Sequence, residues 1–194
     1  VALVGVGLGL LAGGGRPSLP RAAAAKSVSC PRSHAATPAA SPIPTPATPI
    51  SLPKSVGIDR PADFGPLRLT VTGVEGLRCV VGPQTWLPRG VFLAVTLQAV
   101  ANGPLGGEGE FPVAELRGVD RRGEVIEPVL AATAALSHQR GLPIPMLAPL
   151  TIGVPATVVV VFDVPRDATS LVLTSSDGAF AIRLVKSGAG VPGA

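Results

Sequence analysis

The side chains that could carry out chemistry are few in this sequence, and their spacing does not bring them together. Ser137 and His138 could act as a nucleophile and a base, but neighbours in a loop rarely face each other, and no nucleophile-elbow pattern surrounds them. A catalytic serine also needs a third residue that orients the base. We therefore interpret Ser137 and His138 as polar loop residues, and we predict no catalytic residue and no enzyme activity.

Metal, cofactor and phosphate sites are not predicted either. Metal ions are held by several His, Cys or clustered carboxylates, and the chain after residue 53 contains a single His. Glu108 and Glu110, near Asp120, match no calcium-loop spacing, so we interpret them as solvated loop charges. The Gly-rich run 103–109 lacks the Lys-Ser/Thr pair and the following helix of a phosphate loop. The sequence thus predicts no metal ion and no cofactor.

The two cysteines, Cys30 and Cys79, leave several interpretations open. Cys79 lies in an apolar segment, where a cysteine is more often a small buried side chain than a reactive thiol. Cys30 follows Ser-Val-Ser, which lacks the leucine that usually stands three residues before a lipid-modified cysteine. A disulfide between the two is geometrically allowed, and a count of two does not identify the compartment.

Apolar contact is the remaining way in which this chain could bind a partner. Trp86 either packs over the end of a sheet, which we favour, or stands exposed as a binding anchor. Residues 142–149 form an apolar, Pro-rich loop that either closes the core or, if exposed beside Trp86, makes a patch suited to a partner. The candidate partner-binding residues are Trp86, Leu142, Ile144 and Met146.

The charge distribution argues against nucleic acid as a partner. The net charge is +4, yet residues 1–53 contain four Lys or Arg and no acid, whereas residues 54–194 contain 12 bases and 12 acids. A neutral domain lacks the positive surface of a protein that binds a phosphate backbone. One Trp, five Phe and no Tyr are too few for a base-stacking platform.

The N-terminal third of the sequence differs in composition from the rest. Residues 1–15 are apolar and Gly-rich, as in a partial signal peptide or a membrane-anchor helix, and we expect membrane contact only there. Residues 16–53 are rich in Ala, Pro, Ser and Thr, with six prolines between residues 35 and 53, which predicts a disordered linker. Residues 188–194 are predicted to be a disordered tail.

Residues 54–187 are predicted to form an all-β domain. Short β-branched and alternating segments are separated by Gly, Pro and Asp turns, which favours an antiparallel β-sandwich. Residues 129–139 could form one or two helical turns, and the prolines that follow predict a long loop. The expected strands are 67–75, 77–81, 90–101, 113–120, a return strand from 125, 156–164, 170–174 and 179–185.

Four blocks between about residues 66 and 186 carry a resemblance to a known family. They are Leu67–Val74, Arg89–Gln98, Leu116–Pro128 and Val158–Leu173, the last being the most specific. The chain resembles the immunoprotective extracellular immunoglobulin-like domain family of bacterial secreted proteins and lipoproteins. It differs from the family pattern in keeping only Asn102 after the long strand and in having Ile126 where an aromatic residue is common.

The resemblance implies an immunoglobulin-like sandwich outside the cytoplasm, with no established activity and no catalytic residues. Together with the leader and the linker, it leads us to expect a secreted or cell-surface binding or structural module, either free or tethered to the membrane. Its partner would be an envelope protein or a surface polymer. The alternative is an accessory ligand- or metal-binding subunit of an envelope enzyme or transporter; a further one is a spacer without a partner.

Overall fold

A computed structural model describes residue 30 and residues 52–105, 110–147, 149–168 and 170–185. The predictions for the leader 1–15, for most of the linker 16–53 and for the tail 188–194 lie outside these residues. Among the helices of the described residues, none has the length and apolar character that crossing a membrane requires.

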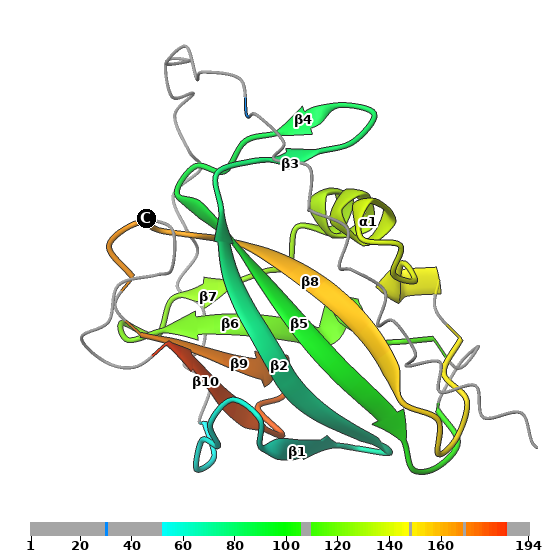
Figure 1. Cartoon of the computed structure of the whole chain (residues 1–194). Coiled ribbons are helices and arrows are strands. Elements are labelled where there is room, and N and C mark those ends of the chain that lie inside the picture. The colour runs from blue at the N-terminus through cyan, green and yellow to red at the C-terminus, as the bar shows by residue number, and fades with distance from the viewer. Residues whose placement is uncertain (1–29, 31–51, 106–109, 148, 169, 186–194) are drawn as a thin grey trace, which may run out of the picture.

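The described residues form two four-stranded antiparallel sheets and a small two-stranded ribbon (Figure 1). The first sheet has the order β1 (Pro61–Phe64), β2 (Leu67–Leu77), β5 (Val91–Ala101) and β8 (Ala156–Val164). The second has the order β10 (Ala181–Val185), β9 (Leu171–Ser175), β6 (Leu116–Asp120) and β7 (Val125–Ile126). The ribbon pairs β3 (Val80–Val81) with β4 (Thr85–Trp86). The predicted all-β, antiparallel class is confirmed.

The main hydrophobic core lies between the two sheets. Alternate residues of each long strand point into it, as the period of two in a β-strand requires. From β2 these are Leu67, Leu69 and Val71, and they meet buried side chains of the opposite sheet such as Leu173 and Ile182. The prediction that Leu67, Leu69 and Val71 share one buried face of their strand is therefore confirmed.

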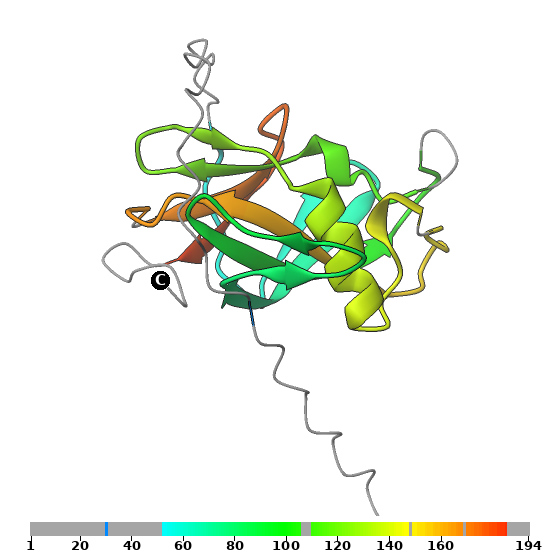
Figure 2. The same ribbon diagram turned by 90° about the horizontal axis from the view of Figure 1, so that it is seen from above.

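A second, smaller core lies on the outer face of β5 and β8. Helix α1 (Leu130–Gln139) packs there, and Figure 2 shows it with the β3–β4 ribbon, both seen from above. This core contains Phe92, Ala94, Val159 and Val161 from the sheet and Ala132, Ala135 and Leu136 from α1. Because β8 is covered on both faces, its valines form a continuous apolar run instead of alternating with polar residues.

Helix α1 is longer than the one or two turns predicted from the sequence. It is rich in Ala and Leu, which favour a helix, and its small side chains allow it to lie close to the sheet. The Thr133 hydroxyl accepts a hydrogen bond from the Val161 backbone N–H at 2.9 Å, which fixes the helix to the free edge of β8. Gly141, with φ of 63°, follows the last turn and ends the helix.

Two strand predictions need correction, and two short strands, β1 and β4, were not predicted. Residues 77–81 do not form one strand: β2 ends at Leu77 and β3 begins at Val80, with Cys79 between them. The first part of the expected strand 113–120 is a 3-10 helix, η1 (Val113–Glu115). The edge strand β1 was not predicted, and a turn through Gly65, with φ of 56°, joins it to β2.

Candidate functional site

Trp86 lies on the β3–β4 ribbon and packs against helix α1. It is half-buried and belongs to the border of the smaller core. A Cβ added at Gly82 would come within 2.8 Å of Trp86 Cζ3 and 3.0 Å of Ala135 Cβ, so the indole ring fills the space between the ribbon and the helix. Trp86 is therefore packed against the domain, which is the arrangement that we favoured.

The other three candidate residues do not all pack where Trp86 does. Leu142 is half-buried and packs against the same smaller core, whereas Met146 packs against the main core. Ile144 is half-buried between them in the sequence. Trp86 and Leu142 thus border the smaller core and Met146 borders the main core, and the proposed role of the four residues in binding stays a prediction.

The most exposed apolar side chains lie further along the same loop. Leu147, Ile152 and Val154 are 66%, 59% and 53% exposed, respectively. These three residues were not among the predicted candidates, although the Pro-rich composition of residues 142–149 indicated this part of the chain. They are scattered side chains of one loop, and such residues are ordinary on protein surfaces.

We had interpreted Ser137 and His138 as loop residues, but both lie in helix α1. Ser137 is fully buried, and its Oγ has no hydrogen-bond partner among the described atoms, whereas His138 is exposed. Their side chains are therefore on different sides of the helix. Within the described ranges, no group of three or more His, Cys, Asp or Glu is placed to hold a metal ion.

Asp120 is a structural residue at the β6–β7 turn. Its buried carboxylate accepts hydrogen bonds from the backbone N–H groups of Arg122 and Glu124, at 2.8 and 2.9 Å. It also pairs with the Arg122 side chain at 3.2 Å, and this hydrogen bond raises the pKa of the guanidinium. The first residue of this turn thus fixes its conformation. Of the two acids that the sequence places near Asp120, Glu110 is exposed and Glu108 lies outside the described residues.

The β9–β10 turn is held in a similar way by Asp177. Its carboxylate accepts hydrogen bonds from the Ser175 hydroxyl and from the Ala179 backbone N–H. The hydroxyl contributes most to lowering the pKa of Asp177 below its ordinary value of 3.8. The charged form therefore supports this turn above about pH 4, and the support is lost as the pH falls through the lowered pKa.

An open hollow of about 610 Å³ lies between β7 and the adjoining ends of β5 and β8. Its charged lining residues are Arg89, Glu124, Glu127, Asp163 and Arg166. The Asp163 carboxylate is already used within the fold, since it accepts hydrogen bonds from the backbone N–H groups of Arg89 and Gly90, at 2.9 and 3.1 Å. The hollow is lined by two arginines and two glutamates, and Glu124 and Glu127 also pair with Arg122 and Arg117, at 3.9 and 3.7 Å.

A disulfide joins Cys30 to Cys79, with 5.9 Å between their Cα atoms. The sequence left this pairing open. Because the bond engages the Cys30 sulfur, it is incompatible with lipid attachment at the same atom. It also attaches residue 30, which lies within the predicted linker, to the segment between β2 and β3.

Known proteins show little similarity to this chain. No family model matches the chain, and no curated protein matches it. Among solved structures, the chain is similar to a conserved hypothetical protein from Bacillus anthracis, with a TM-score of 0.46 and 12% identity. The match covers 68% of this chain and 96% of that one. A likeness of this size carries no conclusion about function.

Proposed function

We propose that this chain is an exported, non-catalytic domain with an immunoglobulin-like fold, which acts as a binding or structural module in the cell envelope or outside it. The single observation that carries the proposal is the Cys30–Cys79 disulfide. Disulfides form and persist in oxidising compartments and are rare in the cytosol. The apolar leader and the Pro-rich linker of the sequence agree with export.

The order of the strands supports an immunoglobulin-like topology. Immunoglobulin domains place strands A, B, E and D in one sheet, and strands G, F and C, with an added C′, in the other. Here β2, β5 and β8 follow the order A, B, E, and β10, β9, β6 and β7 follow the order G, F, C, C′. The chain between C′ and E, where strand D would lie, contains α1 instead, and β1 is an additional edge strand.

This topology agrees with the family that the sequence resembles, the immunoprotective extracellular immunoglobulin-like domains. The disulfide differs from the one in antibody domains, which connects the B and F strands of the two sheets. In this chain it connects the segment before the domain to the end of β2. We therefore infer that the bond attaches the N-terminal linker to the domain and does not hold the two sheets together.

The hollow beside Arg89 and Arg166 favours a second candidate function, that of an accessory subunit which binds a small ligand for an envelope enzyme or transporter. A ligand of mixed charge would suit two arginines and two glutamates. Metal binding has less support, because Asp163 already accepts hydrogen bonds from two backbone amides.

The proposal is tested by fractionating the cells that make the protein naturally. We expect the chain in the envelope or in the medium. A membrane-bound fraction would indicate a retained anchor, and a soluble extracytoplasmic fraction would indicate a cleaved signal. Recovery of the mature protein from the cytosol would contradict the proposal.

A further inference from the structure

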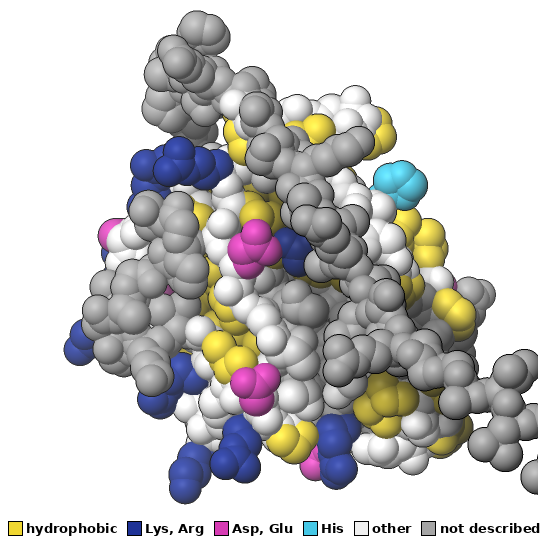
Figure 3. Space-filling model, in the orientation of Figure 1, with side chains coloured by type: hydrophobic (Ala, Val, Ile, Leu, Met, Phe, Trp, Pro, Cys, Tyr) yellow, Lys and Arg dark blue, Asp and Glu magenta, His cyan; other side chains and the backbone are white. Residues whose placement is uncertain are grey.

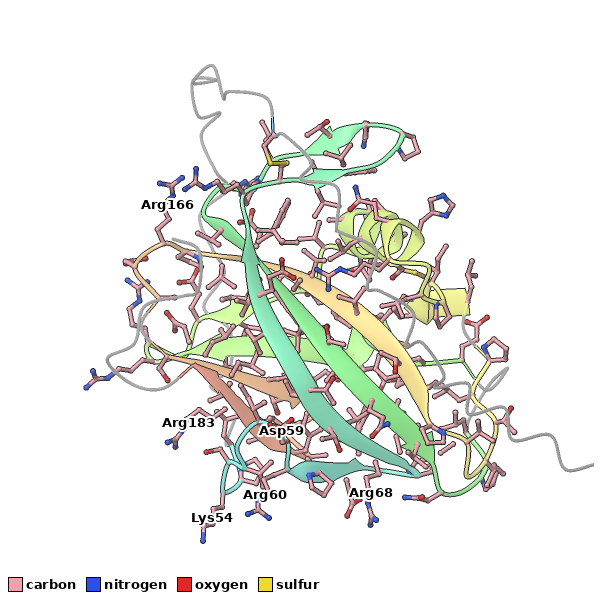
Figure 4. All side chains as sticks on the ribbon, viewed as in Figure 1. Lys54, Asp59, Arg60, Arg68, Arg166 and Arg183 are labelled. Carbon is pink, nitrogen blue, oxygen red and sulfur yellow. A yellow bond between two sulfur atoms is a disulfide. The ribbon has the colours of Figure 1, made fainter. Side chains whose placement is uncertain are left out.

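Four basic side chains lie in a row along one edge of the domain: Lys54, Arg60, Arg68 and Arg183 (Figure 4). Figure 3 shows blue groups along the same lower edge, with yellow and magenta between some of them. We propose that this basic row binds a linear, phosphodiester-linked polymer of the cell envelope. The inference rests on the proposed export of the chain and names the partner's chemistry.

Three separate segments build the basic row. Val56 pairs with Ile182 of β10, through a hydrogen bond from the Val56 N–H to Ala181 and one from the Arg183 N–H to Val56, at 2.9 and 2.8 Å. This pairing places Lys54 next to Arg183, whose Nη2 also lies 3.2 Å from Ser55 Oγ.

A second set of contacts holds Arg60 and Arg68 at this edge. The Asp59 N–H donates to the Val71 carbonyl of β2 at 2.9 Å, so the residue before Arg60 is fixed to the same strand that carries Arg68. Asp59 has φ of 62°, an uncommon conformation that turns the chain sharply at this point. The row therefore depends on backbone pairing and does not require the side chains to gather by themselves.

The basic row has more positive than negative charge. Two carboxylates, Asp59 and Asp63, lie beside its four cations, and Asp63 pairs with Arg68 at 2.9 Å. Within the part of the chain that the structure describes, Lys54, Arg60 and Arg183 form no ion pair, whereas Arg117, Arg122 and Arg140 each have a carboxylate partner. Arg78, Arg89, Arg121 and Arg166 likewise form no ion pair among the described residues, so the row is distinguished by its alignment along one edge of a domain whose bases and acids are equal in number.

The chemistry of the row suits phosphate groups along a chain. Three of its four cations are arginines, whose planar guanidinium groups can donate two parallel hydrogen bonds to a phosphate. All four side chains are exposed. A linear arrangement of fixed positive charges matches a polymer with a negative charge in each repeat better than it matches a single small anion.

The basic row is far from the disulfide that attaches residue 30 to the domain. Arg68 is near the start of β2 and Cys79 is just after its end, so a strand of 11 residues separates the row from the disulfide. At about 3.3 Å per residue, this strand spans roughly 35 Å. The row and the disulfide therefore lie at opposite ends of the domain, as Figure 4 shows for the row.

The test measures binding of the full chain, with its disulfide intact, to poly(glycerol phosphate). The row variant carries Lys54→Gln, Arg60→Gln and Arg183→Gln. The control variant carries Arg78→Gln, Arg121→Gln and Arg140→Gln, which remove the same net charge from exposed sites outside the row and outside the hollow. Each removed contact with an anionic surface is worth about fivefold in affinity, so we expect the row variant to bind about 100-fold more weakly at low salt. Circular dichroism checks that both variants are folded.

The wild-type chain and the control variant should bind within about threefold of each other, and both should lose affinity as salt rises. Equal weakening of both variants would show that net charge alone matters and would overturn the proposal. Tighter binding to phosphatidylglycerol vesicles, or equal binding to polyglutamate, would overturn it as well, by assigning the row to a membrane or to any polyanion. Because binding is measured on the purified protein, its failure is separate from a failure of the fractionation test of export.

Discussion

Replacing Gly90 with alanine is expected to lower the free energy of unfolding by about 3 kcal/mol or more. A Cβ at this position would lie 2.1 Å from the Val164 carbonyl oxygen and 3.0 Å from the Pro165 Cα. These are backbone atoms, so no side-chain rotation can relieve the overlap. The start of β5 would have to move away from β8, although Val91 and Val164 are paired there.

The measurement is urea denaturation of the wild-type and variant proteins. Gly57→Ala is the matched control, since nothing lies within 4 Å of a Cβ at Gly57, and we expect it to change the stability by less than about 1 kcal/mol. If Gly90→Ala were as stable as the wild-type protein, the two backbones would not approach each other as described.

Replacing Val161 with aspartate is expected to cost at least about 4 kcal/mol and to prevent stable folding in many conditions. Val161 is fully buried in the smaller core, where its neighbours are apolar, among them Phe92, Ala132 and Leu136. A carboxylate placed among them would be without a charged partner. In a sandwich whose outer face was open to water, the same substitution would be tolerated.

Thr157→Asp provides the control for this prediction. Thr157 is on the same strand and faces the same side as Val161, because the two positions are four residues apart. It is exposed, beyond the cover of helix α1. We expect Thr157→Asp to change the free energy of unfolding by less than about 1 kcal/mol. A stable Val161→Asp protein would mean that α1 does not cover this face.

The parts of the fold that could be predicted are those with a strong local pattern. The valine run of β8, ended by Pro165, gave the correct bounds Ala156–Val164, and the long segment from residue 90 differs from β5 by one residue. The alternation that opens at Leu67 likewise identified the buried face of β2. In each case the side chains that pack in the core are also the ones that produce the pattern.

Other elements depend on contacts that a linear pattern does not contain. β1 is short and includes Pro61 and Asp63, and it is a strand because β2 lies beside it. Helix α1 has apolar residues all around, so it lacks the periodicity of a helix with one exposed face. Its place is fixed by Thr133 at the edge of β8, a contact between residues 28 positions apart.

The candidate site was predictable only in part, for the same reason. The apolar loop 142–149 and Trp86 are visible as a composition, but their division between two cores depends on tertiary packing. The basic row joins Lys54 to Arg183, which are 129 positions apart, so no motif could indicate it. The spacing of Cys30 and Cys79 allowed a bond without requiring one.

The central claim, an exported domain joined to its N-terminal linker by a disulfide, is tested most directly by peptide mapping of the protein from its own cells. Free thiols are blocked at lysis, and the protein is digested without a reducing agent. We predict a linked pair of peptides that contains Cys30 and Cys79 and separates on reduction. Recovery of both cysteines in the blocked, unlinked form would contradict the account.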